Sequence, residues 1–164
     1  MAVRANLGIL ALTVLLLTGC AEEQEPMSYQ PDPALGPRDV VEQQVRALGR
    51  NAEWGDAEGI RRAYRFASTA NRNAMGELSG FAEVLHNPGY RALLDNRAAR
   101  YSEPVFQADR AAVGVTVTAA NGRAVDYVFF LSRADRADCQ GCWFTDAVHP
   151  GPDRPPEAGP RVNI

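Results

Sequence analysis

The chain has no lysine, only two histidines and only three cysteines, and each shortage excludes a class of function. All 17 basic residues are arginines against 20 acidic residues, so the chain lacks the basic excess of nucleic-acid-binding domains. His86 and His149 do not stand at zinc-ligand spacing from the cysteines. Glycine-rich spacing of the P-loop kind and a nucleophile with triad partners are also missing. The sequence therefore predicts no metal, no cofactor and no nucleic-acid partner.

A long hydrophobic run is missing too, because the apolar stretch over residues 7–18 is shorter than the ~20 residues that cross a bilayer. Arg4 before this stretch and small residues after it give the layout of an export signal. The closing Leu17-Thr18-Gly19-Cys20 resembles a bacterial lipobox, which implies that residues 1–19 are a signal peptide and that Cys20 is acylated with palmitate-type chains. A plain secretory peptide with cysteine at the cleavage position by chance is the alternative.

The lipobox resemblance implies a place in the bacterial cell envelope. Three acyl chains bury enough methylene groups to hold a protein on a membrane permanently. Ala21 follows the cysteine where, in Gram-negative lipoproteins, an aspartate signals retention in the inner membrane. We therefore expect a lipoprotein of the outer membrane whose domain faces the periplasm.

Proline marks both ends of the folded part, because most of the 11 prolines fall within residues 21–37 and 150–160. The first segment is acidic and predicts a flexible tether over residues 20–37. The second has too few apolar residues to become ordered, which predicts a disordered tail over residues 149–164. The remaining residues 38–148 have the length of one domain with a single core.

The first half of this domain has helical periodicity in three apolar stripes. The first stripe follows Pro37, which suits the first turn of a helix, and the second follows the capping pair Gly55-Asp56. The third ends at Asn87-Pro88-Gly89, before a short turn. The stripes and the turn are, in order, Val41, Val45, Leu48 and Ala52; Ala57, Ile60, Tyr64 and Ala67; Leu78, Phe81 and Leu85; and Tyr90, Leu93 and Leu94.

Arg61, Arg62 and Arg65 lie on the polar side of the second stripe. A solvated helix face is the simplest interpretation. A site for an anion is the alternative, because a guanidinium group binds phosphate or carboxylate with two hydrogen bonds.

The second half has the two-residue alternation of strands. Val113, Val115 and Val117 alternate with threonines, and the hairpin signal Asn121-Gly122 comes before a returning run over residues 125–131. A two-residue loop would pair Val113 with Phe130, Val115 with Val128 and Thr116 with Tyr127, and a slip by one residue would exchange the two faces.

Two further strands are predicted around this hairpin. Residues 101–107 should form an earlier strand, which Pro104 places at an edge or a bulge. Residues 143–148 should form the last strand, after a polar connection over residues 132–141. Helices followed by about four antiparallel strands predict an α+β fold, with the helices packed on one face of a curved sheet.

This order resembles the NTF2-like, or cystatin-like, superfamily, in which a curved sheet folds over helices to form a cone with a pocket. More closely, the chain resembles domain-of-unknown-function family four-eight-six-four. Residues 69–76 and the additional Cys139 depart from that family's pattern. The resemblance implies a fold but no activity, because the superfamily contains both enzymes and binding modules. The segments that carry it are Asp39-Val40-Val41, Trp54-Gly55-Asp56-Ala57, Arg65-Phe66-Ala67-Ser68, Phe81 with Tyr90, and residues 142–148.

Cys139-Gln140-Gly141-Cys142 has the spacing of a thiol oxidoreductase. That chemistry needs the first thiol at a helix N-terminus, where the pKa of the thiol falls, whereas this pair lies between two predicted strands. In an oxidising envelope we therefore predict a structural disulfide between Cys139 and Cys142. A redox catalyst is the alternative.

The helix stripes and the hairpin register turn a set of aromatic and hydroxyl-bearing side chains inward. We predict that they line an apolar ligand pocket in the cone, unless they close over one another as an ordinary core. These residues are Tyr64, Phe81, Leu85, Tyr90, Thr116, Tyr127, Phe129 and Trp143.

Enzymes of the superfamily typically use an Asp, His or Tyr inside the cone, which leaves Asp126, Tyr127, His86 and Asp146 as candidates here. No pattern joins these residues into a catalytic constellation, so we predict no catalytic residue. The expected function is a lipid-anchored, non-catalytic module that binds an apolar small molecule or an envelope protein. A homodimer is compatible with this function. The alternative is a small isomerase or hydrolase that works in the same cone.

Overall fold

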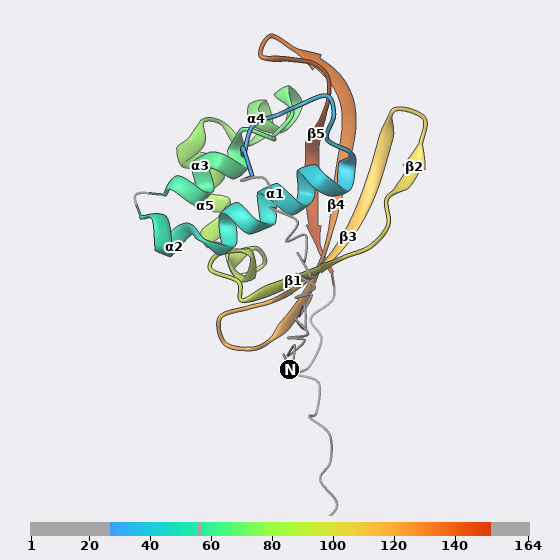
Figure 1. Ribbon diagram of the computed structural model, residues 1–164. Helices are drawn as coiled ribbons and strands as arrows, with labels where there is room; N and C mark the ends of the chain where they lie inside the picture. The colour runs from blue at the N-terminus through green and yellow to red at the C-terminus, as the bar shows by residue number, and fades with distance from the viewer. Residues whose placement is uncertain (1–26, 56, 152–164) are drawn as a thin grey trace, which may run out of the picture.

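The computed structural model describes residues 27–55 and 57–151, so the predicted signal peptide, Cys20 and most of the predicted tail lie outside the described residues. Helices come first along the chain and strands follow (Figure 1). The helical part comprises α1 (Pro37–Gly49), α2 (Asn51–Trp54), α3 (Glu58–Tyr64), α4 (Thr69–Met75), α5 (Leu78–His86) and the 3-10 turn η1 (Arg91–Leu93). The strands are β1 (Ala98–Tyr101), β2 (Val105–Gln107), β3 (Arg110–Thr118), β4 (Ala124–Arg136) and β5 (Cys139–Pro150).

The first predicted helix forms, but it is shorter than expected. Pro37 occupies its first turn, and the Asp39 carboxylate accepts a hydrogen bond from the Gly36 N–H at 2.9 Å, which satisfies a free donor at the start. The predicted stripe is buried at Val41, Val45 and Leu48. Ala52 is exposed in the separate helix α2, because α1 ends at Gly49, so the extension of the first helix to Ala52 is wrong.

The second stripe is divided between a helix and its flanks. Ala57 adopts a left-handed conformation (φ 56°) before α3, and Ile60 is buried as predicted. Tyr64 is half-buried at the end of α3. Ala67 lies beyond α3, where it forms an isolated bridge to Thr145 of β5, so its assignment to the helix is wrong.

α4 (Thr69–Met75) lies in the segment that departs from the family's pattern, where we predicted no helix. Ser68 begins it, because the Ser68 hydroxyl accepts a hydrogen bond from the Asn71 N–H at 3.2 Å. α5 then carries the third stripe, with Leu85 buried and Phe81 half-buried, and it ends before Pro88 as predicted.

The strands form one antiparallel sheet in the order β1-β3-β4-β5, and β2 pairs with β3 along the same edge as β1. The helices lie on one face of this sheet (Figure 1), which confirms the α+β class with five strands rather than about four. The single strand expected over residues 101–107 is interrupted: β1 ends at Tyr101 and β2 begins at Val105, with Pro104 between them.

The register of the β3–β4 hairpin differs by one residue from the prediction. Val113 pairs with Phe129 and Val115 with Tyr127. The loop is one residue longer than expected, because the Ala119 N–H donates to the Arg123 carbonyl and Gly122 adopts φ 85°. Tyr127 and Phe129 therefore lie on the buried face together with the valines, whereas Phe130 lies on the other face.

The last hairpin is longer than predicted. β4 continues to Arg136 and β5 begins at Cys139, so most of the expected polar connection over residues 132–141 is strand. Register shifts interrupt the pairing near Phe130 and near Ala134. Cys139 and Cys142 are joined as a disulfide near the tip of this hairpin and pack with the buried Phe144.

The chain before α1 packs against the helices from residue 27 onward. Tyr29 is 6% exposed, and Met27 and Leu35 also contact the core. The part of the predicted flexible tether that is described, residues 27–36, therefore belongs to the domain. At the other end, β5 continues to Pro150, two residues into the predicted tail.

Candidate functional site

A cavity of about 70 Å³ lies between the helices and the last two strands. Apolar residues from α1, α5, η1, β4 and β5 form most of its wall, and uncharged polar side chains complete it. The apolar part includes Leu48, Phe81, Val84, Leu85, Leu93, Phe129 and Val148, and the polar part is Gln44, Asn71 and Thr145. An apolar wall with a few converging polar groups is the usual form of a small-molecule site.

The three polar side chains belong to one buried hydrogen-bond network. The Thr145 hydroxyl donates to Gln44 Oε1 at 2.6 Å, and Gln44 Nε2 donates to the Ala63 carbonyl at 3.1 Å. Asn71 Nδ2 donates to the Thr145 carbonyl at 3.0 Å. The network therefore connects α1, α3 and α4 to β5 at the wall of the cavity.

The amide oxygen of Asn71 is the group left available at this wall. None of the described residues donates a hydrogen bond to Asn71 Oδ1, although the Asn71 Nδ2 and backbone N–H are both bonded. Asn71 is 9% exposed, and its Oδ1 is not among the buried atoms that lack a partner, so this oxygen remains accessible to solvent or to a ligand. A ligand with an O–H or N–H group would supply the missing donor.

Four of the predicted pocket residues line the cavity, namely Phe81, Leu85, Tyr90 and Phe129. Tyr64 does not line it, but the Tyr64 ring packs against Phe81 with centroids 5.4 Å apart.

The other three predicted pocket residues lie elsewhere. Thr116 lies on the outer face of the sheet, the face that the helices leave uncovered, and its hydroxyl donates to Asp126 at 2.6 Å. Tyr127 is buried on the same face as Phe129, but it lies beside the cavity rather than in its wall. Trp143 packs against Phe106 of β2, with ring centroids 6.0 Å apart.

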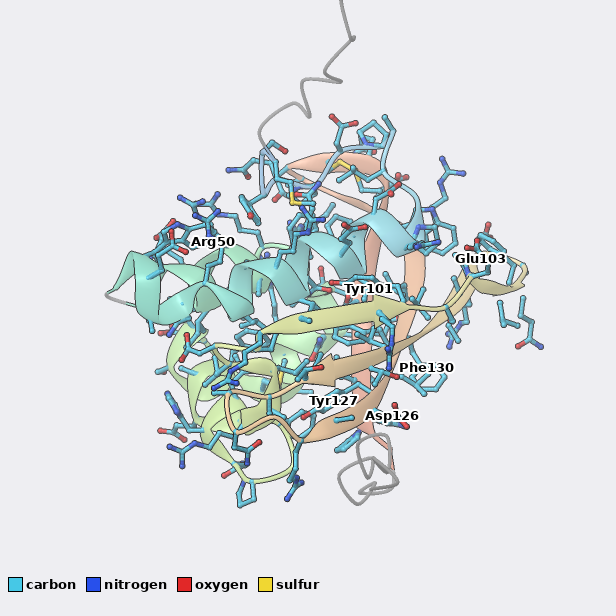
Figure 2. All side chains as sticks on the ribbon, turned by 60° about the horizontal axis from the view of Figure 1, so that its bottom comes forward. Arg50, Tyr101, Glu103, Asp126, Tyr127 and Phe130 are labelled. Carbon is cyan, nitrogen blue, oxygen red and sulfur yellow. A yellow bond between two sulfur atoms is a disulfide. The ribbon has the colours of Figure 1, made fainter. Side chains whose placement is uncertain are left out.

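None of the four titratable candidates lines the cavity. Asp126 is on the outer face, and Figure 2 shows it beside Tyr127 on β4. The Tyr127 hydroxyl donates to the Gly89 carbonyl at 3.0 Å. His86 is exposed at the end of α5, and Asp146 accepts a hydrogen bond from Ser132 at 3.0 Å.

Among the described lining residues, Tyr90 is the one with an ionisable side chain. Its hydroxyl donates to the Val148 carbonyl at 3.0 Å, and its ring stacks on Tyr127 with centroids 6.5 Å apart. This hydrogen bond to a backbone carbonyl fixes the orientation of the Tyr90 ring in the wall. The cavity thus lacks a carboxylate, imidazole or thiol among the described lining residues, which are the usual proton-transfer groups.

Sequence reasoning missed the polar part of the wall. Gln44 had a signal, because it lies on the same helical stripe as Val41, Val45 and Leu48 and is buried with them. Asn71 had no such signal, because α4 was not expected.

The arginines on α3 and at its C-cap bind nearby acidic and carbonyl groups. Arg62 and Arg61 donate to the Glu58 carboxylate at 2.7 and 3.0 Å, and these hydrogen bonds lower the pKa of Glu58. Arg65 donates to the Tyr29 carbonyl at 3.4 Å.

Two further arginines cap the C-terminus of α3. Arg72 and Arg136 both donate to the Arg65 carbonyl, at 3.0 and 2.9 Å, and a cation at this end complements the helix dipole. Asp138 binds Arg136 through both carboxylate oxygens. Burial, and then the charge of Arg136, lower the pKa of Arg72. These side chains therefore have a structural role in joining α3, α4 and β4.

The outer face of the sheet carries an apolar row across four strands. Val105 pairs with Ala112, Ala112 with Phe130, and Phe130 with Ala147. Val105 is 71% exposed and Phe130 is 39% exposed, while no helix covers this face in Figure 1. The His149 ring lies 5.1 Å from Phe130 and borders the row. Exposed apolar rows of this kind mark protein contacts.

Within residues 27–55 and 57–151, no group of three or more His, Cys, Asp or Glu side chains is placed to hold a metal ion. No described helix is long and apolar enough to cross a membrane. No protein-family model, no curated protein and no solved structure matched the chain.

Proposed function

We propose that the protein is a lipid-anchored module of the bacterial envelope whose NTF2-like domain binds a small neutral ligand without transforming it. The cavity carries this proposal, because its described wall is apolar apart from Gln44, Asn71, Thr145 and the Tyr90 hydroxyl. Helices that precede an antiparallel sheet and cover one face of it support the NTF2-like assignment.

The size and the polarity of the cavity define the ligand class. A cavity of about 150 Å³ admits benzene, so about 70 Å³ suits a smaller molecule unless the wall yields. Met75 and Val84 are half-buried residues of the wall, and their outward movement would admit a six-membered ring. The unbonded Asn71 Oδ1 selects a ligand with an apolar body and one hydrogen-bond donor.

Phenol and toluene test this specificity, because they have nearly the same shape and differ in one hydroxyl. Each is titrated into the protein while the amide and methyl NMR signals of the wall are followed. We expect phenol to bind about fivefold more tightly, since one additional hydrogen bond contributes about 1 kcal/mol. Asn71→Leu keeps the side-chain shape and should remove the preference while toluene still binds.

The matched control is Asn73→Leu, the same change at an exposed position of α4, which should keep the preference for phenol. Equal affinities of phenol and toluene for the wild-type protein would contradict the proposed recognition. Signal changes confined to residues outside the wall would contradict the proposed site.

The anchor is tested separately. We expect palmitate to label the wild-type chain in bacteria and not to label Cys20→Ala, and we expect the labelled chain to fractionate with the outer membrane. Equal labelling of both chains would refute acylation at Cys20.

A second candidate function, binding of an envelope protein or of a second copy of the chain, is favoured by the exposed row on the outer sheet face. Light scattering of the Cys20→Ala chain should then show an assembly that Phe130→Arg disrupts. Thr118→Arg, on the same face at the end of β3, is the control. If the chain is monomeric at all concentrations, the row does not bind a second copy, and its partner under this candidate function is then another envelope protein.

A further inference from the structure

The segment before α1 is attached to the side of the domain that carries α1, α2 and α3. The Tyr29 ring packs edge-on against Trp54 with centroids 5.4 Å apart, and the Arg62 guanidinium lies 5.0 Å from the centre of the Tyr29 ring. Met27 lies beside α1, where its sulfur accepts a weak hydrogen bond from Arg46. The chain therefore enters the domain on its helical side.

The chain between Cys20 and this entry point is short. Residues 20–26 span at most about 25 Å even when fully extended. A compact domain of this size has a radius of gyration of about 14 Å, which corresponds to a diameter of about 35 Å. If the far side of the domain touched the membrane, Met27 would lie about 35 Å above it, beyond the reach of the chain. An anchor at Cys20 therefore keeps the helical side near the lipid.

The surface around the entry point has the chemistry of a headgroup-binding face. The Arg62 and Arg50 guanidinium groups lie 4.1 and 4.8 Å from the centre of the Trp54 ring. The Arg46 and Arg50 side chains are each 50% exposed. Guanidinium groups bind phosphate with paired hydrogen bonds, and tryptophan favours the boundary between apolar and aqueous regions.

Charge on this face is positive among the described residues. Over α1, α2, α3 and the flanking Arg50 and Arg65, six arginines exceed four acidic residues, and each glutamate pairs with an arginine. The arginines are Arg38, Arg46, Arg50, Arg61, Arg62 and Arg65, and the acidic residues are Asp39, Glu42, Glu53 and Glu58. Figure 2 shows Arg50 at one end of the domain and both Glu103 and Phe130 toward the other.

We propose that the face formed by α1, α2 and α3 around Met27 and Trp54 docks on phospholipid headgroups of the membrane that holds the acyl chains. The exposed row of the outer sheet face is then turned away from that membrane. This inference rests on the proposed acylation of Cys20, and it adds the orientation of the domain and a lipid-contacting surface.

The two tryptophans of the chain provide the test. Trp54 is at the proposed surface, whereas Trp143 packs against Phe106 of β2, and Figure 1 places α2 and β2 at opposite ends of the domain. Trp143→Phe and Trp54→Phe each leave one reporter. The lipidated full-length variants are placed in vesicles of phosphatidylethanolamine and phosphatidylglycerol that contain a lipid with a nitroxide headgroup. We expect the nitroxide to quench Trp54 at least threefold more than Trp143.

Arg46→Gln should lower the quenching of Trp54, and Arg110→Gln, at an exposed position of β3, is the matched control that should leave it unchanged. Hydrogen exchange of the wild-type chain gives a second measurement that needs no tryptophan substitution. Transfer from detergent micelles to vesicles should slow exchange over residues 46–62 and not over β2.

The possible failures are distinguishable by flotation of the vesicles. Protein that floats with the vesicles but shows equal quenching of both tryptophans, or stronger quenching of Trp143, overturns the docking and leaves the anchor intact. Protein that does not float overturns the anchor, and the docking with it.

Discussion

Replacement of Thr145 with valine tests the buried network that joins α1 to β5. The Thr145 hydroxyl donates to Gln44 Oε1 at 2.6 Å, and the two side chains are 1% and 4% exposed. Gln44 Nε2 donates to the Ala63 carbonyl, which fixes the orientation of the amide. Valine has nearly the shape of threonine, so Thr145→Val removes the hydroxyl and leaves Gln44 Oε1 without a donor.

The expected loss of stability depends on whether one partner of the hydrogen bond is removed or both are removed. A buried acceptor without a donor destabilises a protein by about 1–3 kcal/mol, so Thr145→Val should lower the free energy of unfolding by that amount. Replacement of both partners by apolar groups is much less costly. Gln44→Leu together with Thr145→Val should therefore cost less than the sum of the single changes, by at least about 1 kcal/mol.

Urea unfolding followed by circular dichroism measures all three variants, provided that the slope against urea is unchanged. Thr118→Val is the control, because Thr118 is half-buried on the outer face and should tolerate the same change within about 0.5 kcal/mol. Additive losses from Thr145→Val and Gln44→Leu would refute the network as a coupled unit.

Four further changes test the placement of individual side chains and the role of the disulfide. Tyr127→Phe and Tyr90→Phe each remove a hydroxyl that donates to a backbone carbonyl at 3.0 Å. Each change should therefore lower the free energy of unfolding by about 0.5–1.5 kcal/mol. Only Tyr90→Phe should alter the affinity for phenol in an NMR titration. An equal loss of affinity in both variants would contradict the placement of Tyr127 outside the wall. Gln43→Met should leave thermal stability unchanged or raise it, because Gln43 Oε1 is buried without a hydrogen-bond partner among the described residues. A clear loss of thermal stability would contradict the absence of a partner for this oxygen. Reduction of the Cys139–Cys142 disulfide should cost about 2 kcal/mol, as expected for a short loop, with phenol affinity unchanged, and measurable thiol-exchange turnover would show a redox role instead.

The elements that sequence reasoning predicted best are those with strong local signals. Val41, Val45 and Leu48 recur at helical spacing after Pro37, and they are buried in α1. α5 ends before Pro88 for a reason that is local to the chain, because proline cannot continue the helical hydrogen bonds. The class of fold followed from this order of helical and strand periods.

Weaker local signals gave the errors. α4 has little apolar periodicity, and it is held by the Ser68 cap and by the hydrogen bond of Asn71 to β5. The register of β3 with β4 depended on whether the loop at Asn121-Gly122 contained two residues or three. One residue was enough to place Tyr127 on the face of the β3 valines and to leave Thr116 on the opposite face.

The sequence by itself determined that the chain carries a lipobox-like segment, helices before strands, and an inventory of side chains without a metal set or a triad. Only the tertiary structure decided which side chains share a wall, because Gln44 and Thr145 are 101 residues apart in the chain and meet through packing of α1 on the sheet. Periodicity reports the environment of one segment, whereas a site forms where several segments meet, and those contacts depend on register and packing that no single segment encodes.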